Sequence, residues 1–529
     1  MPDSSSPSPS PSSSASSAGA EADVISPRDR SVITLLLVSA FVVILNETIL
    51  SVALPPIMAD LDLSELTAQW LTTGFMLTMA VVIPLTGFLM GRFSTRQVFS
   101  IAMTLFTIGT VVCVLAPGFL PLLAGRIVQA CGTAIMMPLL MTTVMNLVPP
   151  SKHGRVMGNI SIVIAVAPAL GPTISGAILS FAPWRGLFVL VLPIAVIALV
   201  VGLRRIENVH EATPQPADAL SVVLSVVGFG PLVYGLTGIG GDSGAAATGS
   251  SGPGPDALIA LGVGVVSLAL FVWRQTALQK RDRALLDLRT FAVRNFSVAV
   301  VLMVVMMGAM FGTVVLLPIY LQLVLGLSTL TVGAMMLPGG LVMGLAAPAV
   351  GRMFDRVGPR PLLTPGLGLV VVGILVMSTV GTDTSPLVIV GGHLVMSCGL
   401  ALVFTPLLTT ALGSLPRSLY PHGSAMVGTV QQVAGAAGGA MLVALMSRIA
   451  AGVEADGGSH AQGIAAGTSV AFLVSAVLGV VTIAISLFIR RNPQHGAAPA
   501  DQPEPELQPE PMAATDADED SADSVAEQL

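Results

Sequence analysis

Two ionisable side chains lie inside long apolar segments, and they are the residues best placed to do chemistry. Of the 29 Asp and Glu residues, Glu47 is the one that lies well inside such a segment, and Arg126 is a cation inside another. An ionisable group in a membrane core is costly and usually functional. Burial favours the neutral form of a carboxyl group, so Glu47 could exchange protons near neutral pH. The alternative is that Glu47 only neutralises a buried cation.

The sequence places these two groups at matching depths. Glu47 stands eight residues before Pro55 and Arg126 stands seven after Phe119, which corresponds to ~12 Å and ~10 Å below the same surface at the helical rise. A carboxylate beside a permanent guanidinium can be released by a proton or by a cationic ligand, so the pair could couple the two. Gln129, one turn beyond Arg126, could hydrogen-bond the pair or a ligand.

His393 is the matching residue in the second half of the chain. It lies seven residues into its apolar segment, and Gly399 follows it by six, as Gly132 follows Arg126. An imidazole with an unperturbed pKa of about 6.5 suits proton handling. The alternative is a hydrogen-bonded histidine of the core.

Helices that cross a membrane must position these groups. Of the 529 residues, 53% are hydrophobic and only 10% are charged, whereas a soluble domain carries about 25% charged residues. A run of about 20 apolar residues is long enough to cross a bilayer. We predict an all-α membrane protein with about fourteen spans, near residues 32–54, 68–90, 98–116, 119–147, 158–181, 186–203, 219–239, 256–273, 296–324, 329–350, 361–380, 386–412, 424–447 and 467–489.

The basic residues are distributed asymmetrically over this layout. With the N-terminus in the cytoplasm, 20 of the 23 Lys and Arg residues fall on the cytoplasmic side, Arg185 and Arg448 fall outside, and Arg126 lies within a helix. Positive charge favours cytoplasmic loops, so both termini are predicted to be cytoplasmic. The net charge of −6 comes from an acidic tail after residue 500 and indicates no nucleic-acid partner.

A sequence repeat divides the chain into two halves. GFLMGRFSTR and GRMFDRVGPR recur at an offset of 264 residues, and they match at Gly87/Gly351, Arg92/Arg356 and Arg96/Arg360. Each copy falls between the second and third helix of a six-helix block. We expect a disordered Ser/Pro-rich tail (1–30), an N-terminal six-helix bundle (31–205), an inserted two-helix segment (206–294), a C-terminal six-helix bundle (295–491) and a disordered acidic tail (492–529).

Several chemistries have no support in the sequence. The cysteines, Cys113, Cys131 and Cys398, have neither disulfide nor metal spacing and are expected to be small buried hydrophobic residues. No Walker A loop is present, which argues against direct use of ATP. No nucleophile–base arrangement is visible, so we predict neither an enzyme nor a metal site.

Four local patterns together are specific. They are LNETILSVALP from Leu45, LAGRIVQACGTA from Leu123, APALGPTISG from Ala167 and LLDLRTF from Leu285. With the six-plus-two-plus-six organisation, the chain resembles the fourteen-helix drug:proton antiporter branch (EmrB/QacA type) of the major facilitator superfamily. Within that branch it looks most like the lincomycin-resistance-type permeases.

The chain also departs from the pattern of this branch. Asn46 stands where Asp is usual in the first helix, and the acid, Glu47, follows it. In the first loop motif Gly91 replaces the usual Asp and Ser94 replaces the usual Gly, whereas the second copy keeps Asp355. A charged inner gate is therefore expected to depend on the C-terminal half.

The resemblance implies proton-coupled efflux of amphiphilic drugs or antibiotics across the plasma membrane. It implies a monomer that works by alternating access, driven by the proton gradient without a cofactor. The substrate cavity would include Asn46, Thr48, Gln129 and Met136. The antiporter motif of the fifth helix would be Pro168, Gly171, Pro172 and Gly176, whose small residues are expected to seal the two halves together. The cytoplasmic gate loops would contribute Gly87, Arg92, Arg96, Gly351, Asp355, Arg356, Gly358 and Arg360.

Two other functions fit the same sequence less well. One is transport of a defined metabolite, such as an amino acid, peptide or siderophore, because a fold does not fix its substrate. The other is a membrane sensor that transports nothing. A sensor would not require a buried Glu–Arg pair, and no sensory domain is visible in this sequence.

Overall fold

Long helices make up nearly all of the chain that the structure describes. The computed structural model describes residues 26–63, 65–206, 218–240, 254–281 and 283–489, and within these ranges it contains helices and no strand. The long helices are α2 (Pro27–Leu61), α3 (Glu65–Arg92), α4 (Thr95–Leu115), α5 (Phe119–Leu147), α6 (His153–Leu179), α7 (Arg185–Arg205), α8 (Ala219–Gly240), α10 (Pro255–Leu278), α11 (Arg294–Leu323), α12 (Thr329–Val357), α13 (Arg360–Met377), α14 (Pro386–Gly413), α15 (Tyr420–Ala455) and α16 (His460–Ser486). Almost all of the two predicted tails, residues 1–25 and 492–529, lies outside these ranges.

Local sequence signals set the helix ends. The Ser26 hydroxyl accepts a hydrogen bond from the Asp29 N–H at 3.0 Å and caps the start of α2. Ser94 and Gln97 form a capping box at the start of α4. Gly358 ends α12 with φ +80°, a conformation that favours glycine. The first span is predicted to end at residue 54, but α2 continues to Leu61. Pro55 and Pro56 lie inside α2, and each removes a hydrogen bond without ending the helix.

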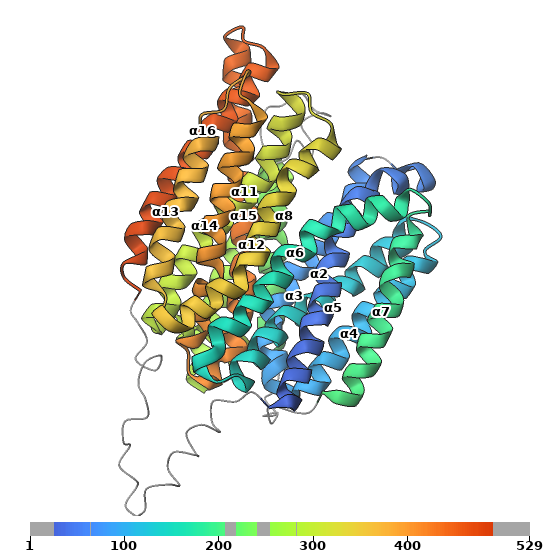
Figure 1. Ribbon diagram of the computed structural model, residues 1–529. Helices are drawn as coiled ribbons and strands as arrows, with labels where there is room; N and C mark the ends of the chain where they lie inside the picture. Colours follow the sequence, from blue (N-terminus) through green and yellow to red (C-terminus); the bar gives the residue numbers. More distant parts are fainter. Residues whose placement is uncertain (1–25, 64, 207–217, 241–253, 282, 490–529) are drawn as a thin grey trace, which may run out of the picture.

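The helices are those of a multi-pass membrane protein, as the composition predicts. Among the described residues, thirteen helices are long and apolar enough to cross a membrane. The remaining long helix is α6, so the number of fourteen spans stays a prediction. The helices run alternately up and down, and α2 begins at the same end of the molecule at which α16 finishes (Figure 1). We call this the basic end, because the loops 92–95, 148–152, 357–360 and 414–419 lie there with their Lys and Arg residues.

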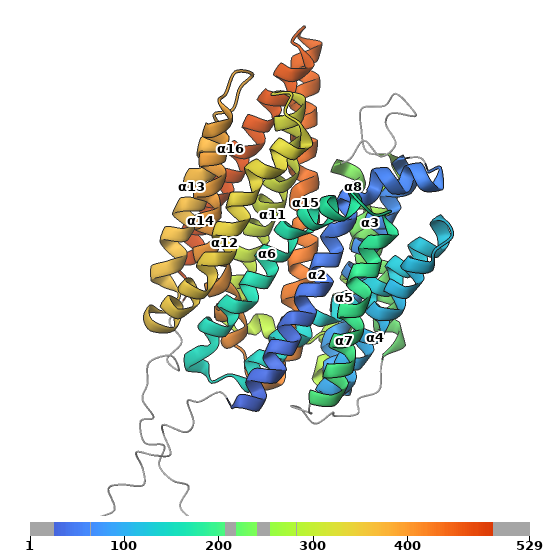
Figure 2. The same ribbon diagram turned by 45° about the vertical axis from the view of Figure 1, so that its right-hand side comes forward.

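The helices gather in two groups, α2–α7 and α11–α16. Figures 1 and 2 show the groups side by side at the basic end and diverging toward the opposite end. The contacts between them are close at the basic end. α6 packs along α12, and α3 packs along α15. The Thr142 hydroxyl of α5 lies 2.7 Å from the Ser424 hydroxyl of α15. The molecule is therefore closed between the two groups at its basic end.

Glycine contacts repeat between the two groups. A Cβ added to Gly109 of α4 would lie 2.5 Å from the backbone N of Gln129 in α5. A Cβ added to Gly373 of α13, 264 residues later, would lie 2.5 Å from the backbone N of Met396 in α14. No other residue allows so close a backbone approach. The sequence repeat is thus also a repeat of helix packing.

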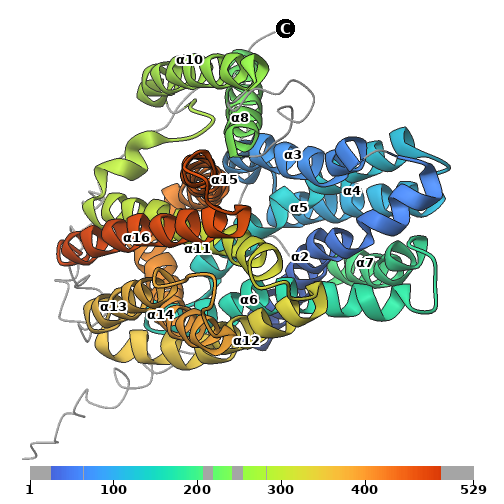
Figure 3. The ribbon, with the colours of Figure 1, turned by 90° about the horizontal axis from the view of Figure 1, so that it is seen from above.

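The inserted helices α8 and α10 form a hairpin on one flank. Seen from above, α8 lies against α3 and α15, and α10 lies outermost (Figure 3). Glycines join the two helices: a Cβ on Gly235 would lie 2.7 Å from the Ala257 carbonyl oxygen. Trp70 of α3 stacks on Tyr234 of α8 with ring centroids 6.0 Å apart. The hairpin therefore covers the seam between α3 and α15, one from each group.

Candidate functional site

Arg126 lies deep inside the first group of helices. Its side chain on α5 is 1% exposed. The guanidinium donates to Gln129 Oε1 at 2.8 Å and to the carbonyl of Leu71 on α3 at 3.5 Å, and it lies 4.0 Å from the centre of the Phe75 ring. A planar guanidinium can hydrogen-bond at its edge and stack on a ring at its face, which an ammonium cannot. These contacts hold a desolvated cation in one orientation.

Gln129 supports Arg126 from the side of α4. Its Nε2 donates to the Thr110 hydroxyl at 2.8 Å, and Thr110 donates to the Phe106 carbonyl at 2.7 Å. Gln129 and Thr110 are fully buried. A polar network satisfied in this way rigidifies its surroundings. Gln129 thus joins Arg126 to α4, and Met136, two turns further along α5, is buried in the apolar core.

Glu47 lies on α2, which packs against α5. Its side chain is half-buried, in contrast to that of Arg126. The carboxyl and the guanidinium interact electrostatically, but within the described ranges no hydrogen bond or ion pair joins the two. Matching depth thus places the two groups near one another without a direct contact in the described residues. Arg126 is bound by neutral partners, and the Glu47 side chain remains partly exposed.

Asn46 and Thr48 flank this carboxyl. Asn46 is 3% exposed, and in the described part of the chain its Nδ2 has no hydrogen-bond partner. A buried amide donor without a partner is uncommon and marks a place where a ligand or water could bind. Thr48 lies against α6, since a Cβ on Gly171 would come 2.8 Å from the Thr48 Cβ. The predicted cavity residues thus share α2 and α5, and Asn46 alone presents a free donor.

The antiporter motif packs within its own group of helices. Gly171 contacts Thr48 of α2, and Gly176 is exposed with open space around it. Pro168 and Pro172 lie within α6, but their side chains are outside the described part. The expectation that this motif seals the halves is wrong for Gly171. The contact with α12 comes earlier in α6, where a Cβ on Gly158 would lie 2.6 Å from the Ala347 carbonyl oxygen.

The fifth helix of the second group packs in the same way. A Cβ on Gly435 of α15 would lie 2.8 Å from the Phe311 ring of α11, and Gly438 lies directly against Gly308. The first and fifth helices of each group are therefore held together by glycine contacts. The close contacts of Gly435 and Gly438 thus join this helix to the first helix of its own group.

His393 is buried in the second group, on α14. Its side chain is 7% exposed and lies against α12, where a Cβ on Gly339 would come 2.5 Å from Nε2. Its other ring nitrogen, Nδ1, has no hydrogen-bond partner within the described ranges. The ring also interacts with the backbone of Met336. It takes the place in α14 that Arg126 takes in α5, so both groups carry a basic side chain at this position.

Asp355 connects the two groups at the basic end. Its Oδ1 accepts a hydrogen bond from the Gly154 N–H at 2.7 Å, and its Oδ2 accepts one from the Arg155 N–H at 2.8 Å. These N–H groups belong to the first turn of α6, where a carboxylate both fills open donors and complements the helix dipole. Gly351 lies one turn earlier on α12, directly against Gly154. The carboxylate of the second loop motif therefore holds α12 on α6.

The two loop arginines act within their own groups. Arg96 donates to the Leu203 carbonyl at 2.5 Å, at the end of α7. Arg360 donates to the Ile489 carbonyl at 2.7 Å and to the Leu487 carbonyl at 3.0 Å, beyond the end of α16. Each cation thus caps the last helix of its six-helix group. They fasten each loop to its own half and do not cross between halves.

The remaining loop residues have different surroundings. Gly87 lies against α15, since an added Cβ would be 3.3 Å from His422 Nδ1. Arg92 lies 6.0 Å from the Phe93 ring and faces a cavity. Arg356 is exposed, and Gly358 supplies the left-handed end of α12. Of the eight predicted gate residues, Gly87, Gly351 and Asp355 make the closest contacts across the halves.

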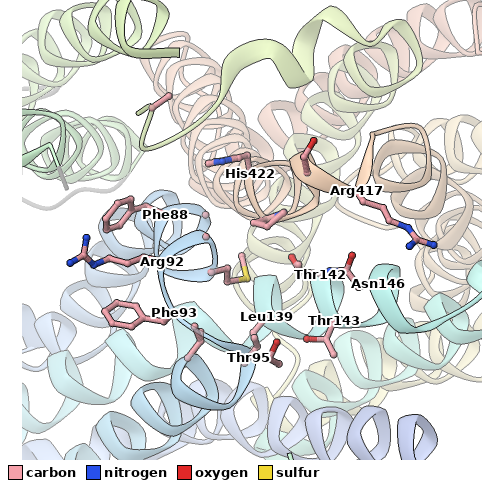
Figure 4. A pocket seen from close by; sticks show the side chains of 17 residues that line it. Phe88, Arg92, Phe93, Thr95, Leu139, Thr142, Thr143, Asn146, Arg417 and His422 are labelled. Carbon is pink, nitrogen blue, oxygen red and sulfur yellow. The ribbon is translucent and has the colours of Figure 1, made fainter. Parts of the chain in front are cut away.

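A cavity of about 240 Å³ opens at the basic end between α3, α4, α5 and α15. Figure 4 shows Thr142, Thr143 and Asn146 on one side of it and Phe88, Arg92 and His422 on the other. Gly91 lines this cavity, and nothing lies within 4 Å of a Cβ placed on it. The missing carboxylate of the first loop motif thus leaves open space.

His422 also lines this cavity. It lies in the first turn of α15, against Gly87 and the backbone of Leu285, and near Asp287 and Arg289. The proline at position 421 was a signal for a helix start. His153 is likewise buried at the start of α6, where its Nε2 lies 2.8 Å from the Val148 carbonyl oxygen.

A polar cluster holds the opposite end of the first group. Asp60, near the end of α2, accepts hydrogen bonds from Trp184 Nε1 at 2.9 Å and from Arg185 at 2.8 Å. Arg185 also donates to the Ala116 carbonyl after α4 and stacks on the Trp184 ring. The hydrogen bonds from Trp184 and Arg185 lower the pKa of Asp60 below its ordinary value. This cluster ties α2, α4 and α7 together.

The fold and these motifs have known relatives. Residues 36–439 match the family described as Major Facilitator Superfamily. The chain is 41% identical to the MFS-type transporter YcnB of Bacillus subtilis over 89% of its own length and 97% of that protein. It is 37% identical to the lincomycin resistance protein LmrB of Listeria monocytogenes, over 87% of this chain and 96% of that one. A multidrug resistance protein B homolog of Mycobacterium tuberculosis is 30% identical over 76% of this chain and 73% of its own.

Solved structures show the same fold. The human organic anion transporter MFSD10 superposes with a TM-score of 0.61 at 16% identity, over 86% of this chain and all of that one. The proton:xylose symporter XylE superposes with a TM-score of 0.60 at 15% identity, over 88% and 97% of the two chains. The chain belongs to the Major Facilitator Superfamily. It is a multi-pass membrane transporter and not an enzyme.

Proposed function

We propose that this transporter exports amphiphilic drugs or antibiotics across the plasma membrane in exchange for protons, without a cofactor. Relatives in the family are named for resistance to lincomycin and to multiple drugs, which supports this class of substrate. Bacterial relatives of this kind support the plasma membrane as its location. The basic end, where the two groups of helices are in contact, then faces the cytoplasm.

One observation carries the coupling: Glu47 is half-buried beside a fixed cation but is not ion-paired with it. Arg126 is bound to Gln129 and Leu71, so Glu47 does not need to stay charged to satisfy it. A carboxyl group in this setting can hold either a proton or a cationic substrate, and the Arg126 charge nearby helps to release either one.

The cycle follows from these contacts. Protonation of Glu47 from the outside removes the negative charge, and the two groups of helices rock to open the basic end. A substrate that enters from the cytoplasm then binds near Glu47 and Asn46 and displaces the proton. The unpartnered Asn46 Nδ2 would donate to the substrate. His393 is the matching candidate for proton handling in the second half.

Transport into inside-out vesicles tests this proposal. With an acidic lumen, the wild-type protein should accumulate lincomycin or a cationic amphiphilic dye, and Glu47→Gln should no longer respond to the pH gradient. Asp383→Asn, in an exposed loop, serves as the control. A Glu47→Gln protein that still pumps against a gradient would exclude this coupling. Movement of amino acids or peptides but of no amphiphile would favour a metabolite exporter.

A further inference from the structure

The inserted hairpin carries a polar network at its basic end. Arg274 of α10 binds Asp218, just before α8, through two hydrogen bonds of 2.6 and 2.7 Å. Asp218 also accepts from the Ser221 hydroxyl, and Ser221 accepts from Gln275 Nε2 at 2.8 Å. We call these four residues the latch. They join the ends of α8 and α10 to one another and position the Gln275 amide.

The latch holds the segment that follows α10. Gln275 Oε1 accepts hydrogen bonds from the Leu285 N–H at 2.8 Å and from the Leu286 N–H at 3.3 Å. We call residues 284–291 the strap. Gln275, Leu285 and Leu286 are almost completely buried. Each polar group of Gln275 is therefore used, one to fix its own side chain and one to bind the backbone of the strap.

The strap lies against the gate between α3 and α15. The His422 ring of α15 contacts the backbone of Leu285 and interacts electrostatically with Asp287 and Arg289 of the strap. On its other side, His422 packs on Gly87 of α3. Ala284, the first residue of the strap, lines the cavity at the basic end together with His422 and Arg92. The strap thus contacts α15 at the point where α15 meets α3.

We propose that the inserted hairpin, through the latch, controls the opening of the seam between α3 and α15 at the basic end. Gln275 is the positioning residue that holds the strap against His422 and so keeps α15 close to α3. The proposal rests on alternating access as described under the proposed function. The two inserted helices would then set how readily the α3–α15 seam opens, independently of which substrate is carried.

The geometry gives this role to Gln275 and not to the strap itself. The strap is joined covalently to α11 of the second group, while α8 packs on both α3 and α15. If the hairpin stays with α3 when the seam opens, the distance between hairpin and strap changes. The two N–H···O bonds to Gln275 are the polar contacts that resist this change, and buried bonds of this kind are costly to break without a replacement.

Accessibility of the gate cavity tests the proposal. In a protein whose three cysteines are replaced by alanine, Asn146→Cys places a reporter thiol in the cavity. A membrane-impermeant maleimide is added to inside-out vesicles without substrate or pH gradient. Gln275→Leu should raise the labelling rate about tenfold, the effect of losing one to two buried hydrogen bonds. Gln275→Met fills similar space without the amide and should label like Gln275→Leu.

Thr276→Val is the matched control. Thr276 follows Gln275 on α10, is exposed, and bonds only within its own helix. It should label like the parent. Equal labelling of the parent and a well-folded Gln275→Leu protein would overturn the proposal, and so would parent-like labelling of Gln275→Met.

A cross-link tests the same proposal if Gln275→Leu does not fold. In the protein without other cysteines, thiols at Gln275 and Leu285 joined by a short bis-methanethiosulfonate reagent should stop transport, and a reductant should restore it. Full transport by the cross-linked protein would overturn the latch. Labelling needs neither drug nor proton gradient. If Gln275→Leu raises the labelling rate in a protein that exports no drug, the proposed function is rejected and the proposal for Gln275 is retained.

Discussion

Gly91 occupies in the first group of helices the position that Asp355 occupies in the second, 264 residues later. Asp355 binds the first turn of α6 across the two groups, whereas Gly91 lines an open cavity beside the first turn of α15. The two seams at the basic end are thus closed by different means. The α6–α12 seam uses a carboxylate, and the α3–α15 seam uses contacts of Gly87 with His422 and Ala425.

Replacing Asp355 should weaken the closed basic end. Asp355→Ala removes two charge-assisted hydrogen bonds to α6, each worth about 1.5–3 kcal/mol in a typical protein, and we expect a clear shift toward the open gate. The labelling rate of a cavity cysteine from the basic side would measure it. Asp355→Asn keeps one acceptor and should fall between Ala and the parent. Equal labelling of all three proteins would show that this carboxylate does not hold the gate.

Gly91→Asp should have the opposite effect. It restores the carboxylate of the loop motif, in open space and near the start of α15, where a negative charge contributes about 0.3–1 kcal/mol. The second helical residue, Pro421, has no N–H to donate, so the gain should be smaller than the loss in Asp355→Ala. We expect slower labelling and slower turnover. Gly91→Asn fills the same space without charge and separates the two effects, and faster labelling of Gly91→Asp would contradict the comparison.

The sequence predicts the architecture well, because it depends on patterns that are local. Apolar runs locate each long helix, and the 264-residue offset relates Gly109 to Gly373 and Arg96 to Arg360, which have matching contacts. These features depend on length, composition and repetition. They need no knowledge of how one helix is rotated against another.

The site is less predictable, because it depends on how each helix is rotated against its neighbours. Equal depth along two helices does not fix the direction of two side chains, and it therefore leaves open whether Glu47 and Arg126 form an ion pair; within the described residues they interact electrostatically without one. The partners of Arg126 on α3, the Leu71 carbonyl and the Phe75 ring, have no sequence signal that points to α5. The pairing of Asp355 with α6 likewise depends on which helices meet across the halves.

Arg126→Lys should reduce transport more than it reduces stability. Lysine keeps the charge, but it cannot donate to Gln129 and Leu71 and stack on Phe75 at once. Transport should fall at least tenfold, while the unfolding temperature in detergent changes by only a few degrees. Transport assays and thermal unfolding of the same preparations would check this. Thr107→Val, at a helix next to α5, provides a conservative control, and wild-type transport by Arg126→Lys would mean that charge alone is sufficient.

Asp60 should make stability depend on pH only in acid. Hydrogen bonds from Trp184 and Arg185 lower its pKa, so its contribution is complete above the ordinary Asp value of about 3.9. That contribution is lost as the pH falls through the lower pKa of the folded protein. Thermal unfolding of the parent and of Asp60→Asn should therefore differ by a constant amount between pH 5 and 8, and the difference should shrink below about pH 4.

The same variant separates stability from coupling. Asp60 lies at the end opposite the basic end, which faces the external pH in the proposed orientation, yet its lowered pKa keeps its charge constant between pH 5 and 8. Asp60→Asn should thus keep the parent's pH dependence of transport, whereas Glu47→Gln should lose it. A pH profile that moves with Asp60→Asn and stays fixed with Glu47→Gln would place the titrating group in the Trp184–Arg185 cluster. In that case the proton would be handled at the outer surface and not beside Arg126.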